Sequence, residues 1–271
     1  MDQGWWVKMN IYPLYSSSKG NMFLIESNNT SILIDVGVTY KNICNALDGI
    51  NKKISDISAV LITHEHSDHI KGLPQLCKNN PDLNIFATEK TKLYLQEMLC
   101  EKNILANIHG LQYNDKFNIG DLNITVIETS HDAVMPCAYN IKDEKNTVTF
   151  ATDLGYISDD MQKYLNSSNC NILESNFDKI MLEYGPYPST VKSRIRGDHG
   201  HLSNEDTARA IFCALLNNPT SKFILSHLSE NNNTEALAKD TIFTYLKENN
   251  IENPDISFAT QDLSFERYEL W

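Results

Sequence analysis

Short apolar runs alternate with polar turns along the chain, and their length and period predict the secondary structure. Runs of about four to eight apolar residues between turn residues are typical of buried strands. We expect such strands at 11–15, 22–26, 32–36, 57–62, 83–87, 121–128, 136–141, 147–151, 171–173, 223–225, 256–259 and 265–268. Apolar residues three or four positions apart predict helices at 40–47, 70–78, 88–101, 159–165, 206–216 and 235–247.

The order of these elements predicts the fold class. Hairpins come first, with Asn28-Asn29 joining two strands, and strand–helix alternation follows, which is typical of layered α/β structure. Segment 175–202 has neither period, and we expect it to be irregular, with a break at 185–188. Because no repeat or low-complexity linker divides the chain, we expect one domain over 1–271, with 1–8 as a disordered leader.

Composition places the chain among globular proteins. It has 271 residues, of which 41% are hydrophobic and 21% charged. The net charge of −12 argues against bulk attraction to nucleic acid or to an anionic membrane, although it leaves room for a local basic groove. No apolar stretch approaches the ~18 residues of a spanning helix, and residues 1–8 lack the apolar core of a signal peptide. Six scattered cysteines without a CxxC pair indicate reduced core thiols, so we expect a cytoplasmic protein without a membrane segment.

The densest chemistry follows the apolar run 57–62. Residues 64–69 are His-Glu-His-Ser-Asp-His, which places three imidazoles and a carboxylate within six positions. Side chains two residues apart at a strand end project to the same side, so His64 and His66 can bind one ion. A turn then brings Asp68 and His69 to a second ion, and these ligand types suit Zn, Mn or Fe. The alternative is a polar loop that caps a helix beginning near Ile70, but a cap needs one such residue and not four.

Single residues of ligand type follow three later strands. His131 comes after the strand that ends near Glu128, Asp153 after 147–151, and His227 after 223–225. Each alone is an ordinary turn residue. Because strand ends in α/β folds gather at one rim, where such folds place their sites, we expect these three side chains to join the histidine cluster.

With these residues the sequence resembles the metallo-β-lactamase-fold hydrolases over nearly its whole length. The family's HxHxDH motif stands at 64–69, and the three single ligands follow in the family's order. The resemblance implies an α/β fold of four layers, an αββα sandwich, with two divalent metal ions at one edge between the sheets. It also implies that the first ion is bound by His64, His66 and His131, the second by Asp68, His69 and His227, and that Asp153 bridges the two.

The chemistry of such a centre can be argued without the family. Two divalent ions bring four positive charges and two carboxylates remove two, so the centre attracts anions. A water shared by ions ~3.5–4 Å apart becomes hydroxide near neutral pH, and the ions can hold both the attacking and the leaving oxygen of a phosphodiester. Hydrolysis of an ester, amide, thioester or phosphodiester fits this chemistry.

A basic stretch outside the metal ligands narrows the choice. Residues 185–197 contain Lys192, Arg194 and Arg196 and no acid, a local reversal of charge that favours contacts with phosphates. The alternative interpretation is a solvated helix face.

A histidine lies close to this stretch. His201 precedes a helix whose N-cap we expect at Ser203, with Asp206 at the capping-box position. A histidine beside a helix N-terminus is suited to bind an anion and to donate a proton. We expect His199 to lie behind the ligands or at the surface, and His109 to be structural.

Four stretches, 17–21, 173–176, 185–188 and 200–204, resemble one branch of the family, the YycJ/WalJ (VicX) proteins of Gram-positive bacteria. These are similar to ribonuclease Z in carrying a histidine ahead of a helix. The resemblance implies an exonuclease that acts from the 5′ end of DNA, and an association with a cell-wall two-component regulatory operon. Phe177 departs from the branch, in which a histidine is expected after the asparagine.

Together these observations predict a dinuclear metal-dependent phosphodiesterase, a 5′-to-3′ DNA exonuclease that uses a metal-bridging hydroxide. Asp68 is expected to orient the hydroxide and His201 to protonate the leaving group. DNA rather than RNA is the expected partner, contacted by Lys192, Arg194, Arg196, Asn176 and Ser203. The alternatives are a hydrolase of small esters or thioesters, of glyoxalase-II or lactonase type, and a non-catalytic regulator of a cell-wall two-component system. The two ions are expected to be Zn or Mn, with Fe as a further option, and the sequence predicts no oligomeric state.

Overall fold

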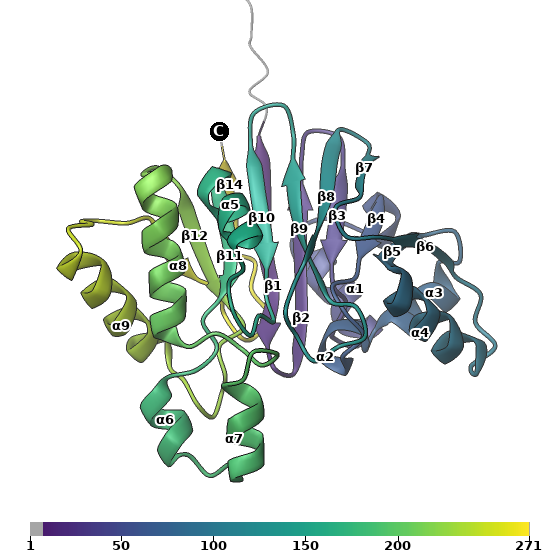
Figure 1. Ribbon diagram of the computed structural model, residues 1–271. Helices are drawn as coiled ribbons and strands as arrows, with labels where there is room; N and C mark the ends of the chain where they lie inside the picture. The colour runs from purple at the N-terminus through teal and green to yellow at the C-terminus, as the bar shows by residue number, and fades with distance from the viewer. Residues whose placement is uncertain (1–7, 271) are drawn as a thin grey trace, which may run out of the picture.

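Two β-sheets pack face to face at the centre of the molecule, and helices cover both outer faces (Figure 1). The computed structural model describes residues 8–270. Within that range, sheet A has the strand order β14-β1-β2-β3-β4-β5-β6, and sheet B has the order β13-β12-β11-β10-β9-β8-β7.

Each sheet contains a parallel part. Sheet A consists of β1 (Met9–Ser17), β2 (Gly20–Glu26), β3 (Ser31–Ile34), β4 (Ala59–Leu61), β5 (Asn84–Thr88), β6 (Asn107–Leu111) and β14 (Tyr268–Leu270). Sheet B consists of β7 (Lys116–Ile119), β8 (Leu122–Glu128), β9 (Cys137–Lys142), β10 (Thr147–Ala151), β11 (Cys170–Glu174), β12 (Lys222–Ser226) and β13 (Ile256–Phe258). Strands β3 to β6 pair in parallel, and so do β10 to β13, so their carboxyl ends meet at common edges.

The alternation of side chains along each strand divides the apolar residues between the inner and outer faces of its sheet. In β2, Phe23 and Ile25 belong to the core between the sheets, whereas Met22 and Leu24 pack toward the helices. Phe23 meets Phe150 of β10 edge to face, with 5.0 Å between the ring centroids. Strands that are buried on both faces appear in the sequence as continuous apolar runs.

Helices complete the outer layers. On sheet A lie α1 (Tyr40–Gly49), α3 (Leu73–Asn79) and α4 (Glu89–Cys100), and on sheet B lie α5 (Asp159–Ser167), α8 (Asn204–Asn217) and α9 (Glu235–Glu248). The predicted four-layer αββα sandwich is confirmed. The remaining helical segments are short: η1 (Ile54–Asp56), α2 (Ser67–Ile70), α6 (Lys179–Tyr184) and α7 (Ser189–Ile195). In the part of the chain that the structure describes, no helix combines the length and the apolar character needed to cross a membrane.

Three predictions of secondary structure are corrected. Segment 175–202 is not irregular throughout, because α6 and α7 lie within it, on either side of the break at 185–188. Leu182 is the one buried residue of α6 and α7 has none, so neither helix produces an apolar stripe. The sequence also does not predict β6 and β7, which are partly exposed edge strands, and the last strand lies at 268–270 instead of 265–268.

The cysteines and the N-terminus also differ in part from expectation. All six cysteines are free, and Cys77, Cys137 and Cys170 are buried as predicted. The other three are not core thiols, because Cys44 is half-buried and Cys100 and Cys213 are exposed. Residues 1–7 of the predicted leader lie outside the described residues, and Lys8 forms an ion pair with Glu269.

Candidate metal centre

The histidine-rich segment leaves β4 and enters α2, a single helical turn that begins after His66. The loop that follows β3 fixes this turn, since the Val36 N–H donates to the carbonyl of His69 (2.8 Å) and Gly37 packs against the carbonyl of Asp68. A Cβ atom at Gly37 would lie 1.6 Å from that oxygen, so this close approach requires glycine. The contact turns Asp68 and His69 toward the ends of the two sheets.

Three residues of the site lie just past strand ends and have a left-handed backbone. They are Asp35 (φ +58°) after β3, Asp153 (φ +59°) after β10 and His227 (φ +55°) after β12. An L-residue in this region costs roughly 1–2 kcal/mol, and Asp and His adopt it more often than most side chains do. This conformation turns each side chain away from the direction of its strand and into one polar cluster.

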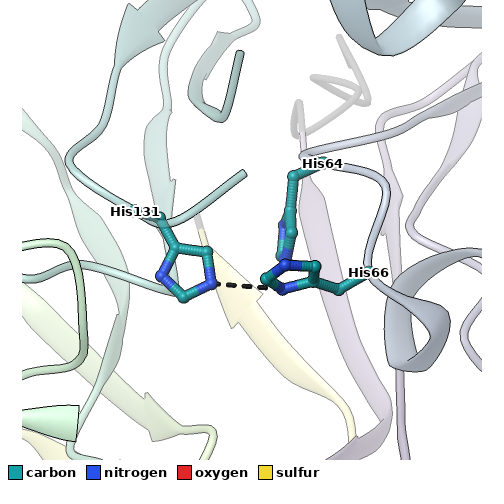
Figure 2. A group of neighbouring side chains, drawn as sticks. All are labelled: His64, His66 and His131. Carbon is teal, nitrogen blue, oxygen red and sulfur yellow. Dashed lines mark hydrogen bonds between the residues drawn. The ribbon is translucent and has the colours of Figure 1, made fainter. Parts of the chain in front are cut away.

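Six of the seven predicted ligands meet in this cluster as two groups of three. The ring nitrogens of His64, His66 and His131 lie within 4.8 Å of one another, and we call this group the first subsite. In Figure 2, which shows this group, His66 Nδ1 lies 3.3 Å from His131 Nε2. The second subsite consists of Asp68, His69 and His227, whose ligand atoms also lie within 4.8 Å of one another.

Asp153 lies between the two subsites. Its Oδ1 is 3.8 Å from Nε2 of His131 in the first subsite, and its Oδ2 is 3.4 Å from Nε2 of His69 in the second. The same carboxylate is 3.6 Å from the His227 ring. Oδ1 is the atom close to both His131 and His227, so the carboxylate contacts both groups and can bridge two ions.

In the second subsite, buried carboxylates orient the imidazoles. His69 Nδ1 donates to Asp35 Oδ2 (2.7 Å), and His227 Nδ1 donates to Glu174 Oε2 (3.3 Å). Each of these contacts occupies Nδ1 and leaves Nε2 on the side of Asp68. Ligating histidines in metalloproteins are commonly held by such a carboxylate.

In the first subsite, uncharged oxygens have the same role. His64 Nδ1 lies 3.0 Å from Thr63 Oγ1, and His131 Nδ1 donates to the carbonyl of Gly200 (3.1 Å). The Thr63 hydroxyl in turn donates to Asp35 Oδ2 (2.8 Å). Nε2 of both histidines is therefore left to face the centre of the subsite.

Unpaired buried atoms indicate that the cluster is built for a cation. His64 Nε2, Asp153 Oδ2 and His227 Nε2 are buried and have no hydrogen-bond partner among the described residues. A buried polar atom without a partner destabilises the folded state, and such atoms are rare in native proteins. Imidazole nitrogens and carboxylate oxygens are ligands of divalent transition metals, so the residues present fit a divalent metal centre.

The pKa values of the histidines separate the two subsites. Burial lowers the pKa of His64 well below its usual value, and it also lowers the pKa of His131. Burial acts in the same direction on His69 and His227, but carboxylates outweigh it there. Asp153 and Asp35 raise the pKa of His69 well above its usual value, and Asp153 with Asp68 and Glu174 raises the pKa of His227 to about 10. Without metal, protons therefore supply positive charge to the second subsite and not to His64 or His131.

Glu174, at the end of β11, connects the cluster to His201. Its Oε2 accepts from His201 Nδ1 (3.0 Å) as well as from His227, and its Oε1 accepts the backbone N–H of Leu154 (2.7 Å) and of Leu202 (3.0 Å). With these four hydrogen bonds Glu174 is an orienting residue, although it lies close enough to be a ligand. His201 is left with Nε2 as the nitrogen that can donate to a bound group.

A cavity of about 290 Å³ opens above the metal centre, and α7 forms one wall. His66, Asp68, His131, Asp153, His201 and His227 all line it. Figure 1 shows α6 and α7 side by side, projecting beyond the sheets. Arg194 of α7 lines the cavity and pairs with Asp132, the residue after His131.

The other two predicted cations point elsewhere. Lys192 donates to the carbonyl of Glu183 on α6, and Arg196 pairs with the Glu183 carboxylate (3.0 Å). Neither lines the cavity, so the structure brings only Arg194 of the three basic residues to the metal centre.

Asn176 and Ser203 also have partners inside the protein. The amide of Asn176 donates to the carbonyl of His227 (2.9 Å), which places it behind a predicted ligand. Ser203 is the N-cap of α8 as predicted, and its hydroxyl accepts from the N–H of Asp206 (3.2 Å). Phe177 is buried and does not line the cavity, whereas His199 and His109 are exposed.

Three acidic residues of the site are absent from the sequence-based ligand set. Asp35 and Glu174 hold imidazoles, and Asp132 lies 3.4 Å from His131 Nε2 and pairs with Arg194. For Asp35 and Glu174 the available signal is a lone carboxylate at the end of an apolar strand, the same signal that reveals Asp153.

Comparisons with known proteins agree with this geometry. The family model described as the beta-lactamase superfamily domain matches residues 30–228. The chain is 35% identical to the exodeoxyribonuclease WalJ of Streptococcus pneumoniae serotype 2 over 252 residues, 93% of each chain. It is also 35% identical to the exodeoxyribonuclease YycJ of Bacillus anthracis, over 87% of this chain and 88% of that protein.

Among solved structures, the metallo-β-lactamase-fold protein YhfI from Bacillus subtilis superposes with a TM-score of 0.73. The superposition covers 97% of this chain and 99% of that chain, at 18% sequence identity. At this identity the likeness shows the fold alone.

Proposed function

The chain belongs to the beta-lactamase superfamily, in the metallo-β-lactamase-fold branch of WalJ and YycJ, and we propose that it is a metal-dependent exonuclease that degrades DNA from the 5′ end. Two curated relatives that match most of the chain are named exodeoxyribonucleases, which supports DNA over RNA. We place the reaction in the cytoplasm, where six free cysteines stay reduced.

We propose two divalent ions, Mn or Zn with Fe as a further option, one in each subsite and both in contact with Asp153. When bound, such ions acidify water and offset the negative charge that gathers on a phosphodiester during hydrolysis. The subsites would then satisfy the unpaired atoms of His64, Asp153 and His227.

Two side chains of the cavity have separate roles in the reaction: Asp68 positions the attacking water, and His201 donates a proton to the leaving oxygen. Asp68 accepts a hydrogen bond from the attacking water and directs its oxygen at phosphorus, and the proton that the water loses as the new bond forms passes to solvent. As the bond from phosphorus to the sugar oxygen breaks, His201 donates the proton of Nε2 to that oxygen. Glu174 holds the His201 ring in place through Nδ1. His201 is the observation that carries the proposal, because it lines the cavity beside the two ligand groups without belonging to either predicted set.

Substrate contacts follow from charge and position. Arg194 is the cation that can reach a phosphate in the cavity, at the expense of its ion pair with Asp132. Lys192 and Arg196, which contact Glu183 of α6, would bind the backbone farther along the strand. Asn176 and Ser203 support this surface through His227 and α8 instead of touching DNA.

The test is the release of nucleotides from 5′-phosphorylated double-stranded DNA by the manganese-loaded protein. We expect His201→Ala to lower kcat by about 10²–10⁴-fold, the usual contribution of general acid catalysis, with the metal content unchanged. Asp68→Ala should lose activity together with the ion of the second subsite, measured by metal analysis.

The matched control is His109→Ala, which removes an exposed histidine of β6 that contacts Asn84 and should leave the rate unchanged. A chromogenic thioester and a lactone serve as competing substrates. Intact DNA together with rapid thioester or lactone turnover would overturn the nuclease and leave a small-molecule hydrolase.

A further inference from the structure

A second cavity, of about 500 Å³, lies beside the metal centre. Its lining includes Ser130, Leu154 and His199, which directly neighbour His131, Asp153 and Gly200 in the wall of the metal cavity. Because consecutive Cα atoms are 3.8 Å apart, three segments of single-chain thickness separate the two cavities. A ligand held at the metal centre would have to cross these three segments to enter the second cavity.

The lining of this cavity mixes apolar, aromatic and polar groups, as suits a flat ring with a polar edge. Ile127, Leu154 and Met161 are buried and contribute the apolar part of the lining. Tyr156 and Tyr164 add aromatic rings, and the Tyr156 side chain is 51% exposed, so its ring is available to a ligand. Aromatic side chains of this kind are the platforms on which proteins stack nucleobases.

The charges of the cavity select against a phosphate. Glu128 and Asp160 lie in its lining, and the one lysine there, Lys163, is paired with Asp160 (2.6 Å). An anion would be repelled by the remaining carboxylate, whereas an uncharged ring would not. The hydroxyls of Thr129 and Ser158 can donate to or accept from any base edge, so we expect little base preference.

A third cavity near the metal centre is less suitable. A cavity of about 910 Å³ next to His227 is lined by Glu230, Glu235 and Asp262. Its one basic residue, Lys19, is already paired with Glu230 (2.6 Å). A DNA strand that left the centre in this direction would meet the two unpaired carboxylates of Glu235 and Asp262, against one in the aromatic cavity, so the aromatic cavity is the more favourable direction.

We propose that the cavity with Tyr156 binds the base of a nucleotide whose phosphate lies at the metal centre. This inference rests on the proposed nuclease function and names the part of the substrate that the second cavity recognises. Stacking on Tyr156 would hold the strand so that the adjacent phosphodiester stays beside His201 and Asp68.

The first experiment measures binding directly. Thymidine 5′-monophosphate and deoxyribose 5-phosphate are each titrated calorimetrically into the manganese-loaded and the metal-free protein. We expect the nucleotide to bind at least tenfold more tightly than the sugar phosphate. Tyr156→Ala should remove most of this difference and Tyr156→Phe should keep it, because the ring and not the hydroxyl makes the stack.

The matched control is Tyr94→Ala, since Tyr94 is 44% exposed, belongs to α4 on the other sheet and lines neither cavity. In DNA degradation, Tyr156→Ala should raise KM about tenfold with kcat nearly unchanged. On DNA whose terminal nucleotide lacks its base, the same substitution should have no further effect, as expected for two changes that remove one contact.

The outcomes separate this inference from the proposed function. Equal affinity for nucleotide and sugar phosphate, or an unchanged nucleotide affinity in Tyr156→Ala, would overturn the base cavity even if DNA is degraded. If nucleotide binding depends on Tyr156 but the protein leaves DNA intact, the result would support base binding in the cavity and overturn the exonuclease function.

Discussion

The two subsites offer similar ligands to a metal, but the groups behind those ligands differ. A hydroxyl holds His64 and a peptide carbonyl holds His131 in the first subsite. In the second subsite, buried carboxylates hold His69 and His227. The second subsite therefore concentrates negative charge, and its imidazoles have raised pKa values where those of His64 and His131 are lowered.

This difference shows that the ligand set alone does not define a metal site. A carboxylate behind an imidazole makes the ring more basic and the site more attractive to a cation, but it also strengthens the competing proton. We expect the second subsite to bind its ion more tightly above neutral pH and to lose it sooner as the pH falls.

We expect the largest effect from a substitution of Asp153, whose carboxylate lies between the two subsites. Asp153→Asn keeps the shape of the side chain but removes the charge between the two groups, so affinity at both subsites should fall. We expect activity to drop by more than about 100-fold, beyond the usual loss for a residue behind the ligands. Metal titration followed by elemental analysis checks this, and retention of both ions at the wild-type ratio would contradict a bridging role.

Asp35→Asn and Glu174→Gln test whether the metal affinities of the two subsites can be changed separately. Each removes a carboxylate behind one imidazole of the second subsite, so affinity there should fall about 10–100-fold while the first subsite changes less. Glu174→Gln should cost more activity than Asp35→Asn because it also releases His201. The control is Glu248→Gln, an exposed carboxylate at the end of α9. Equal losses of metal affinity at the two subsites would show that neutral oxygens and carboxylates are equivalent as partners of the imidazoles.

The smallest expected effect is a difference in proton release. With a pKa of about 10, His227 carries a proton at neutral pH in the metal-free protein and must lose it to bind a cation, whereas His64 is already neutral. Affinity at the second subsite should therefore rise about tenfold per pH unit for each proton released, up to about pH 10. Calorimetry in buffers of different ionisation enthalpy measures the number of protons released on metal binding. The same number of protons at both subsites would contradict the predicted difference between them.

Much of the centre could be predicted because its signals are local. Residues 64–69 place four candidate ligands in one segment, and a single polar residue follows each of three apolar strands. The strands themselves are buried on both faces, so the layered fold leaves continuous apolar runs in the sequence.

The remaining features depend on contacts that only the folded chain brings together. Asp35 is 34 positions from His69, and a lone carboxylate after a strand does not reveal which ring it will hold. The basic stretch predicts that Lys192, Arg194 and Arg196 contact phosphates, and the structure adds that α6 places Glu183 beside Arg196, which lies outside the lining of the cavity. Because α6 and α7 bury almost nothing, the apolar pattern could not indicate this pairing.

The left-handed backbone at Asp153 and His227 has a consequence for the evolution of this chain. Glycine adopts these φ angles without the steric cost that the two residues bear. A mutation to glycine would remove a ligand and at the same time relieve the backbone, which offsets part of the stability lost with the side chain. Selection for folding alone would therefore do little to retain either residue.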